Sequence, residues 1–235
     1  MILPNVRATL TPSQVEWILD LLTRAWDRPR EHAERRLTEE GLDALLDDPR
    51  TLNALLTGRE AGAPLGLTFY LLVRHALLEG GIDDRVLADY LAAVLVAFGE
   101  GDAAQRVGGG EERVHYLVDI VQALDGASGS QAFLLRAHMG NYALWLSGLF
   151  PDRVTAWVQR RGAPGLRYYE ELGSFGYRTA AQTSDAASHG LDAVFDRCSV
   201  LFPELRTALN RISDRYLFPA RAAGIERLLR QVRDG

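Results

Sequence analysis

Apolar side chains recur along this chain at the spacing of an α-helix, and no other feature of the sequence constrains the fold so strongly. Clear examples are the segments 12–26, 84–98 and 191–202, in which residues three or four positions apart are apolar. No segment alternates polar and apolar residues in the manner of a half-buried β-strand. The pattern predicts an all-α protein, an irregular multi-helix bundle of roughly ten helices with no β-sheet.

Prolines and glycines mark the expected ends of these helices. Leu-Phe-Pro tripeptides stand at 149–151, 201–203 and 217–219, and we interpret each as a junction where phenylalanine is buried as one helix ends and proline starts the next. The segment 63–79 is apolar nearly all round, so we expect it in the middle of the bundle. The glycine-rich segment 99–110 is the clearest loop. We therefore expect a single all-α domain over 1–235, in which two helical subdomains would meet near 99–110.

The composition excludes several kinds of chemistry. All 26 basic residues are arginine, so a Schiff-base lysine and a phosphate-binding P-loop lysine are both absent. We attribute the lack of lysine to the base composition of a GC-rich bacterial genome. Cys198 is the single cysteine, which rules out an intrachain disulfide and a zinc site built from several thiolates of this chain.

Charge and hydropathy bear on partners and location. The formal net charge is -5, so nothing global attracts nucleic acid or an anionic membrane surface. The first ten residues lack the basic and apolar regions of a signal peptide, and the apolar stretches are too short to span a bilayer. We predict a cytoplasmic protein without a membrane span. We interpret the arginines near the end of the chain as surface and helix-end residues: Arg211, Arg215, Arg221, Arg227, Arg230 and Arg233.

A stripe of polar and aromatic residues is expected on one face of the helix over 131–149. Its members are His138, Asn141, Tyr142 and Trp145, and their neighbours are apolar. A few convergent polar groups on an apolar helix can line a ligand pocket. There, His138 could serve as a general base and Tyr142 as a proton donor. The other interpretation, the commoner outcome for such residues, is that the polar tips bond to neighbouring groups and fix the packing.

Two further sets of residues are weaker candidates. Glu171 or Glu170 could orient His138 if their helix packs beside the stripe, and Tyr168 would then line the same pocket. Glu112 and His115 match the Glu-x-x-His step of di-iron helical bundles. That chemistry needs two such steps and the sequence has one, so we predict no cofactor and no metal site.

The missing catalytic motifs and the many amphipathic helices together predict a function. We predict a non-catalytic helical module that binds a partner protein or an apolar small molecule, and we expect no nucleic-acid partner. Whether the chain forms a homo-oligomer stays open. The alternative is an enzyme or a ligand-binding bundle, haem-oxygenase-like or di-iron-like by analogy of class. Its pocket would lie at His138, Asn141, Tyr142 and Trp145.

Overall fold

The computed structural model describes residues 1–26, 29–57, 64–99, 104, 106–107 and 117–218. The all-α prediction is confirmed, because these residues form thirteen α-helices and one π-helical turn, called η2, and no strand. The elements are α1 (Pro12–Trp26), α2 (Arg30–Glu40), α3 (Leu42–Leu46), α4 (Pro49–Thr57), α5 (Leu65–Glu79), α6 (Arg85–Gly99), α7 (Leu117–Leu124), α8 (Gly129–Leu149), α9 (Pro151–Arg161), α10 (Leu166–Ala181), α11 (Ser184–Ser188), α12 (Asp192–Val200), α13 (Phe202–Ile212) and η2 (Ser213–Leu217).

The helices are more numerous than the apolar spacing predicts, because some are short. The charged segment 29–47 divides into α2 and α3 at Gly41, whose φ of 83° lies in the left-handed region that favours glycine. A second short helix, α11, begins where the Thr183 hydroxyl accepts a hydrogen bond from the backbone N–H of Ala186. Helices of five residues carry too little apolar periodicity to be recognised from sequence.

The Leu-Phe-Pro junctions lie where the sequence predicts helix boundaries. Pro151 opens α9 directly after Phe150, and Pro203 lies in the first turn of α13 beside the fully buried Phe202. At the third tripeptide, Phe218 follows η2 directly, and the chain beyond it lies outside the described residues.

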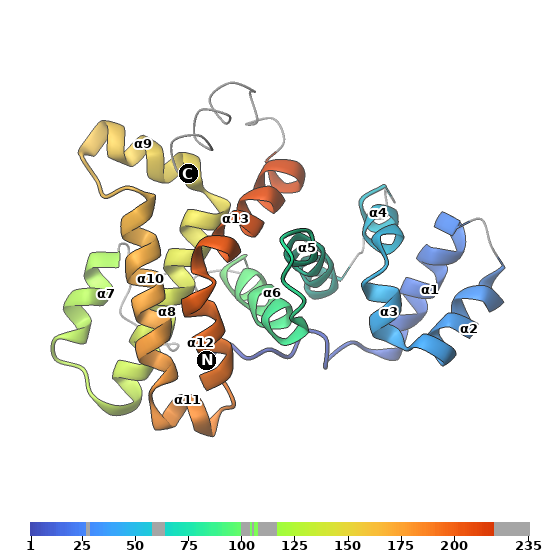
Figure 1. Ribbon diagram of the computed structural model, residues 1–235, viewed down its shortest axis with the longest axis horizontal. Coiled ribbons are helices and arrows are strands. Elements are labelled where there is room, and N and C mark those ends of the chain that lie inside the picture. Colours follow the sequence, from blue (N-terminus) through green and yellow to red (C-terminus); the bar gives the residue numbers. More distant parts are fainter. Residues whose placement is uncertain (27–28, 58–63, 100–103, 105, 108–116, 219–235) are drawn as a thin grey trace.

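The helices surround one continuous hydrophobic core. In Figure 1 the helices α1–α4 gather at one end, α5 and α6 occupy the middle, and the remaining helices form the other end around α8. Helix α13 packs against α5 and α12 packs against α6, so helices from both sides of the 99–110 segment contact each other. Most of that segment lies outside the described residues, and a division there stays a prediction.

Helices α8 and α10 approach each other closely because glycines lie at the contact. A Cβ added at Gly140 would come within 2.7 Å of the Tyr177 ring, and one at Gly176 within 2.8 Å of the Arg136 carbonyl. A Cβ at Gly173 would overlap the Phe202 ring. These positions leave no room for a side chain, so the two helices pack almost backbone to backbone.

An ion-pair network joins the α1–α4 end to the rest of the protein. The guanidinium of Arg74 on α5 is 1% exposed and donates to Asp47 at 2.7 and 2.9 Å and to Asp83 at 2.5 Å. Arg85, at the start of α6, donates to Asp47 at 2.6 Å from a more exposed position. Burial raises the pKa of the Asp47 carboxyl, but hydrogen bonds from the two arginines outweigh burial and hold this pKa below its usual value.

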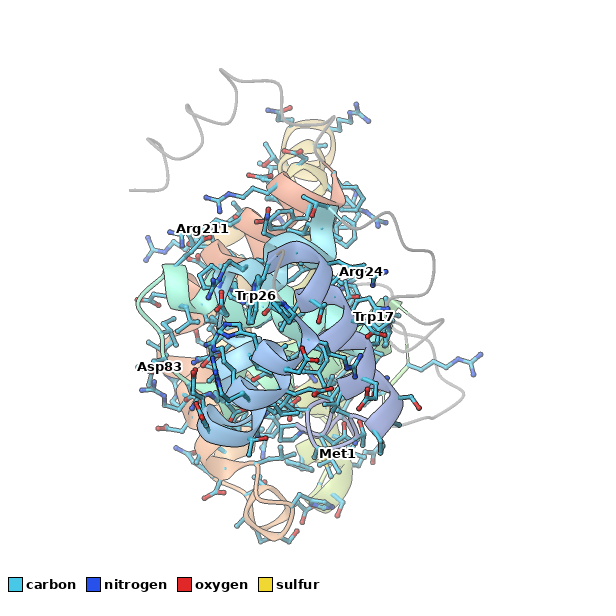
Figure 2. All side chains as sticks on the ribbon, turned by 90° about the vertical axis from the view of Figure 1, so that its right-hand side faces the viewer. Met1, Trp17, Arg24, Trp26, Asp83 and Arg211 are labelled. Carbon is cyan, nitrogen blue, oxygen red and sulfur yellow. The ribbon has the colours of Figure 1, made fainter. Side chains whose placement is uncertain are left out.

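Figure 2 looks onto the α1–α4 end, where Trp26 lies within the cluster of side chains. The guanidinium carbons of Arg36 and Arg50 lie 5.1 and 4.7 Å from the centre of the Trp26 ring. These cation–π contacts join α1 to α2 and α4. Among the described helices, none combines the length and the apolar character needed to cross a bilayer.

Candidate ligand-binding site

The stripe predicted on α8 takes part in a chain of aromatic contacts, which we call the aromatic cluster. The ring of His138 lies 5.6 Å from Phe98 on α6 and 6.3 Å from Tyr142, and Trp145 lies 5.0 Å from Phe150, measured between ring centres. Trp145 and Phe150 are half-buried, so the cluster extends from the interior to the surface. Its members are Phe98, His138, Tyr142, Trp145, Phe150 and Phe218.

His138 is the polar group at the inner end of this cluster. It is 7% exposed, and its Nε2 atom has no hydrogen-bond partner among the residues that the structure describes. Burial lowers the pKa of His138 to about 4, opposed by a hydrogen bond with the Ala104 backbone that raises it. The imidazole is therefore neutral at pH 7.

The tautomer of His138 follows from these contacts. A hydrogen bond that raises a histidine pKa is one in which the ring N–H donates to a carbonyl, because the carbonyl favours the protonated ring. Since Nε2 has no hydrogen-bond partner among the described residues, we assign Nδ1 as the donor to Ala104. In a neutral imidazole the other nitrogen is then an acceptor. With this assignment, Nε2 of His138 presents a lone pair that no described residue engages.

Asn141 has a different environment from the rest of the predicted stripe. The hydroxyls of Tyr90 on α6 and Tyr177 on α10 donate to its Oδ1 atom at 2.7 and 2.8 Å. All three side chains are buried, and burial raises the pKa of both tyrosines well above the usual value. Asn141 ties three helices together through the oxygen that a ligand would otherwise use.

The structure does not bring the predicted carboxylate to His138. Glu171 is exposed on α10 and accepts a hydrogen bond from Arg167 at 2.8 Å, while Glu170 accepts one from Arg206 at 2.5 Å. Tyr168, in the first turn of α10, has its ring 5.8 Å from that of Tyr169 and contacts no ring of the aromatic cluster among the described residues. As a ligand-binding residue, Tyr168 stays a prediction.

The other candidate reactive groups are a buried cysteine and two residues proposed as metal ligands. Cys198 is fully buried, and burial raises its pKa far above the usual value, which suppresses the reactive thiolate. Within the described residues, no three histidine, cysteine or acidic side chains are grouped so that they could hold a metal ion. Glu112 and His115, the weak metal candidates, lie outside the described residues.

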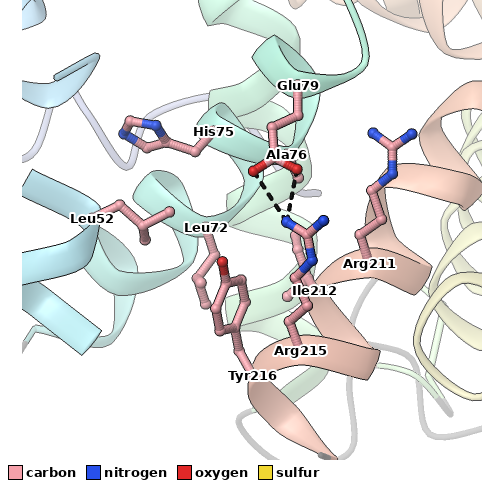
Figure 3. A pocket seen from close by; sticks show the side chains of 9 residues that line it. All are labelled: Leu52, Leu72, His75, Ala76, Glu79, Arg211, Ile212, Arg215 and Tyr216. Carbon is pink, nitrogen blue, oxygen red and sulfur yellow. Dashed lines mark hydrogen bonds and ion pairs between the residues drawn. The ribbon is translucent and has the colours of Figure 1, made fainter. Parts of the chain in front are cut away.

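A small pocket lies away from the aromatic cluster and was not predicted from the sequence. Side chains from α4, α5, α13 and η2 surround it, and its free space of about 10 Å³ has room for about one water molecule. Figure 3 shows Arg215 reaching from η2 to Glu79 on α5, with Arg211 nearby on α13. Its residues come from segments far apart in the chain, so no local pattern could have revealed it.

Comparisons with known proteins identify no similar protein. No protein-family model, no curated protein and no solved structure matches the chain. The fold and the geometry of its side chains are therefore the basis for assigning a function.

The lowered pKa of His138 predicts a pH-dependent stability. The unfolded chain takes up a proton near pH 6.5 and the folded protein only near pH 4, so the unfolded state gains protons first as the pH falls. The contribution of His138 is complete above pH 6.5 and decreases by about 2 kcal/mol between pH 7 and pH 5. Urea denaturation at both values should show this loss in the wild type and not in His138→Leu.

The comparison between the two proteins isolates His138 from other titrating groups. His75 also has a pKa lowered by burial, but it is present in both proteins and its effect cancels in the difference. An equal loss of stability in wild type and His138→Leu would contradict the prediction.

Proposed function

We propose that this protein is a non-catalytic, cytoplasmic helical module that binds a small, flat, largely apolar molecule at the aromatic cluster. The observation that supports this proposal is the buried Nε2 of His138, which we assign as an acceptor and which has no partner in the described part of the chain. Leaving such a group unpaired costs about 1–3 kcal/mol. A ligand that donates one hydrogen bond to Nε2 removes this cost, and its faces can stack on the surrounding rings.

A binding role fits His138 better than a catalytic one. A pKa of about 4 makes the imidazole a weak base at neutral pH, and efficient general bases have pKa values near the working pH. Each acidic side chain predicted to orient it, Glu171 and Glu170, is engaged by an arginine instead. The enzyme alternative therefore has less support than binding.

A small molecule also fits the surface better than a protein partner. The large apolar side chains that are exposed are distributed over many elements, from Leu3 near the N-terminus to Val86 on α6, Phe175 on α10 and Val200 on α12. Scattered apolar residues are normal on a protein surface, whereas partner sites usually expose a contiguous patch.

Indole and 1-methylindole provide a direct test, because they differ by the single N–H donor. We expect isothermal titration calorimetry to give at least about tenfold tighter binding for indole, the value of one hydrogen bond of about 1.4 kcal/mol. His138→Leu should lose this preference. His189→Leu, a change at an exposed histidine, should keep it.

Two results would count against the proposal. One is equal affinity of the wild type for indole and 1-methylindole, which would mean that Nε2 does not accept from the ligand. The other is undiminished indole binding by His138→Leu, which would place the bound molecule elsewhere.

A further inference from the structure

The segment 1–10 passes over several helices and belongs to none of them. It contains no helix and no strand, and Figure 1 shows it running past α6 before α1 begins at Pro12. Three of its side chains, Ile2, Val6 and Leu10, are half-buried and pack against the hydrophobic core. These contacts fasten the segment near both of its ends and in its middle, and we call it the strap.

Helices α3, α5 and α6 together form the docking site of the strap, which we define as Asp43, Gly66 and Asp89. Asp89 on α6 is 7% exposed and accepts a hydrogen bond from the backbone N–H of Arg7 at 2.8 Å. Both carboxylate oxygens of Asp43 on α3 accept from the Arg7 guanidinium at 2.6 Å. Gly66 on α5 leaves room for Val6, since a Cβ at this glycine would lie 3.1 Å from the Cγ1 atom of Val6. The docking site therefore matches an apolar residue followed by an arginine.

The backbone of the strap is hydrogen-bonded within itself. Among the described residues, it forms no hydrogen bond with the backbone of any helix. The backbone N–H and the hydroxyl of Thr9 donate to the Asn5 carbonyl at 2.9 and 2.8 Å. Helix α1 caps itself, because the Thr11 backbone N–H donates to the Gln14 side chain at 2.8 Å and the Gln14 backbone N–H donates to the Thr11 hydroxyl at 3.3 Å. The strap can therefore leave its docking site without breaking the start of α1.

The polar contacts of the strap are ones that water can replace. The side chains of Arg7 and Asp43 are 42% and 29% exposed, and exposed ion pairs contribute little stability. Burial raises the pKa of Asp89, and the hydrogen bond from the Arg7 backbone opposes this shift only in part. The docked strap thus does not fully compensate the Asp89 carboxylate for its lost hydration. Both features favour release of the strap without unfolding of the helices.

We propose that the docking site exchanges its own strap for the strap of a second copy of this chain. The same apolar, backbone and guanidinium contacts form in either arrangement, so the exchange loses no contact. Each copy has one strap and one docking site, and reciprocal exchange therefore closes in a dimer. The dimer needs no exposed apolar patch, because the strap already covers the surface that it uses. This inference does not depend on the function proposed for His138.

A charge swap between Arg7 and Asp43 tests the exchange. In the wild type the tethered strap competes with that of a second copy, so the chain should be mostly monomeric at micromolar concentration. Arg7→Asp brings two carboxylates together within one chain, and Asp43→Arg brings two guanidinium groups together. When the two variants are mixed, each strap meets the opposite charge on the docking site of the other variant. We expect analytical ultracentrifugation at low ionic strength to show a heterodimer at least about tenfold tighter than the association of either variant with itself.

The matched control carries Arg7→Asp and Asp43→Arg in the same chain, which restores opposite charges within that chain. It should remain monomeric like the wild type. Circular dichroism verifies that each variant is folded, and both substitutions are made at partly exposed side chains. A mixture of the single variants that associates no more tightly than each variant alone would overturn the proposal.

Amide hydrogen exchange of the wild-type chain tests release of the strap without any substitution. The backbone N–H of Arg7 should exchange at least about tenfold faster than that of Leu91, a buried residue in the middle of α6, because release requires no unfolding of this helix. Equal exchange rates would mean that the strap leaves only when the whole protein unfolds, and this result also contradicts exchange between folded copies. His138 takes no part in these contacts, so neither experiment bears on the indole test.

Discussion

Replacing Arg74 with methionine is expected to lower the free energy of unfolding by about 4 kcal/mol. Methionine fills much of the same volume but leaves the partly buried carboxylate of Asp47 without its 2.7 and 2.9 Å hydrogen bonds. Asp47 then keeps only the 2.6 Å hydrogen bond from the more exposed Arg85. A carboxylate that loses its buried partner recovers little hydration, and this makes the change far more costly than loss of a surface ion pair. Urea denaturation at pH 7 measures the effect.

Arg85→Met is the matched control, because Arg85 donates to the same carboxylate from a side chain that is 44% exposed. Its loss should cost less than about 1 kcal/mol, as water replaces an exposed arginine readily. If the two variants were destabilised equally, the burial of Arg74 would not be what makes its ion pair important.

Gly173→Ala should destabilise the protein by about 3 kcal/mol, the upper part of the range for overpacked cores. The added methyl group would overlap the buried ring of Phe202 and come within 2.9 Å of the Cβ of Ala143. Neither neighbour can yield easily, because α8, α10 and α13 meet at this point. Thermal and urea unfolding should both show the loss.

Gly126→Ala makes the same chemical change where there is space. No atom lies within 4 Å of the position of its Cβ, and the residue is exposed. Its effect on stability should be within about 0.5 kcal/mol of zero. Comparable destabilisation of both variants would indicate a general cost of replacing glycine instead of a specific clash.

The fold class could be predicted from sequence because helical periodicity is a local property. Each apolar face, such as that of α6, is visible within fifteen consecutive residues. The break at Gly41 could not be seen, since the charged segment around it has almost no apolar pattern. Pairings such as Arg74 with Asp47, which are 27 positions apart, depend on how helices meet and leave no local trace.

The candidate site was predictable in part for the same reason. His138, Tyr142 and Trp145 share one helix, so their common face follows from spacing alone, and the structure shows them in contact. The partners of Asn141 lie 51 and 36 positions away on two other helices. Their hydroxyls engage the amide oxygen, and no spacing rule along α8 could have revealed that.

The glycine contacts between α8 and α10 also determine how a molecule can reach His138. The close packing at Gly140 and Gly176 opposes sliding or rotation of either helix. Gly140 lies about 200° around α8 from His138, so the face of α8 that packs against α10 points away from the imidazole. A ligand that binds His138 as proposed would therefore approach from the other side of α8, where the rings of Phe98 and Trp145 lie. The rate of ligand entry would then depend on rotation of these two aromatic side chains, with no movement of the helix backbones.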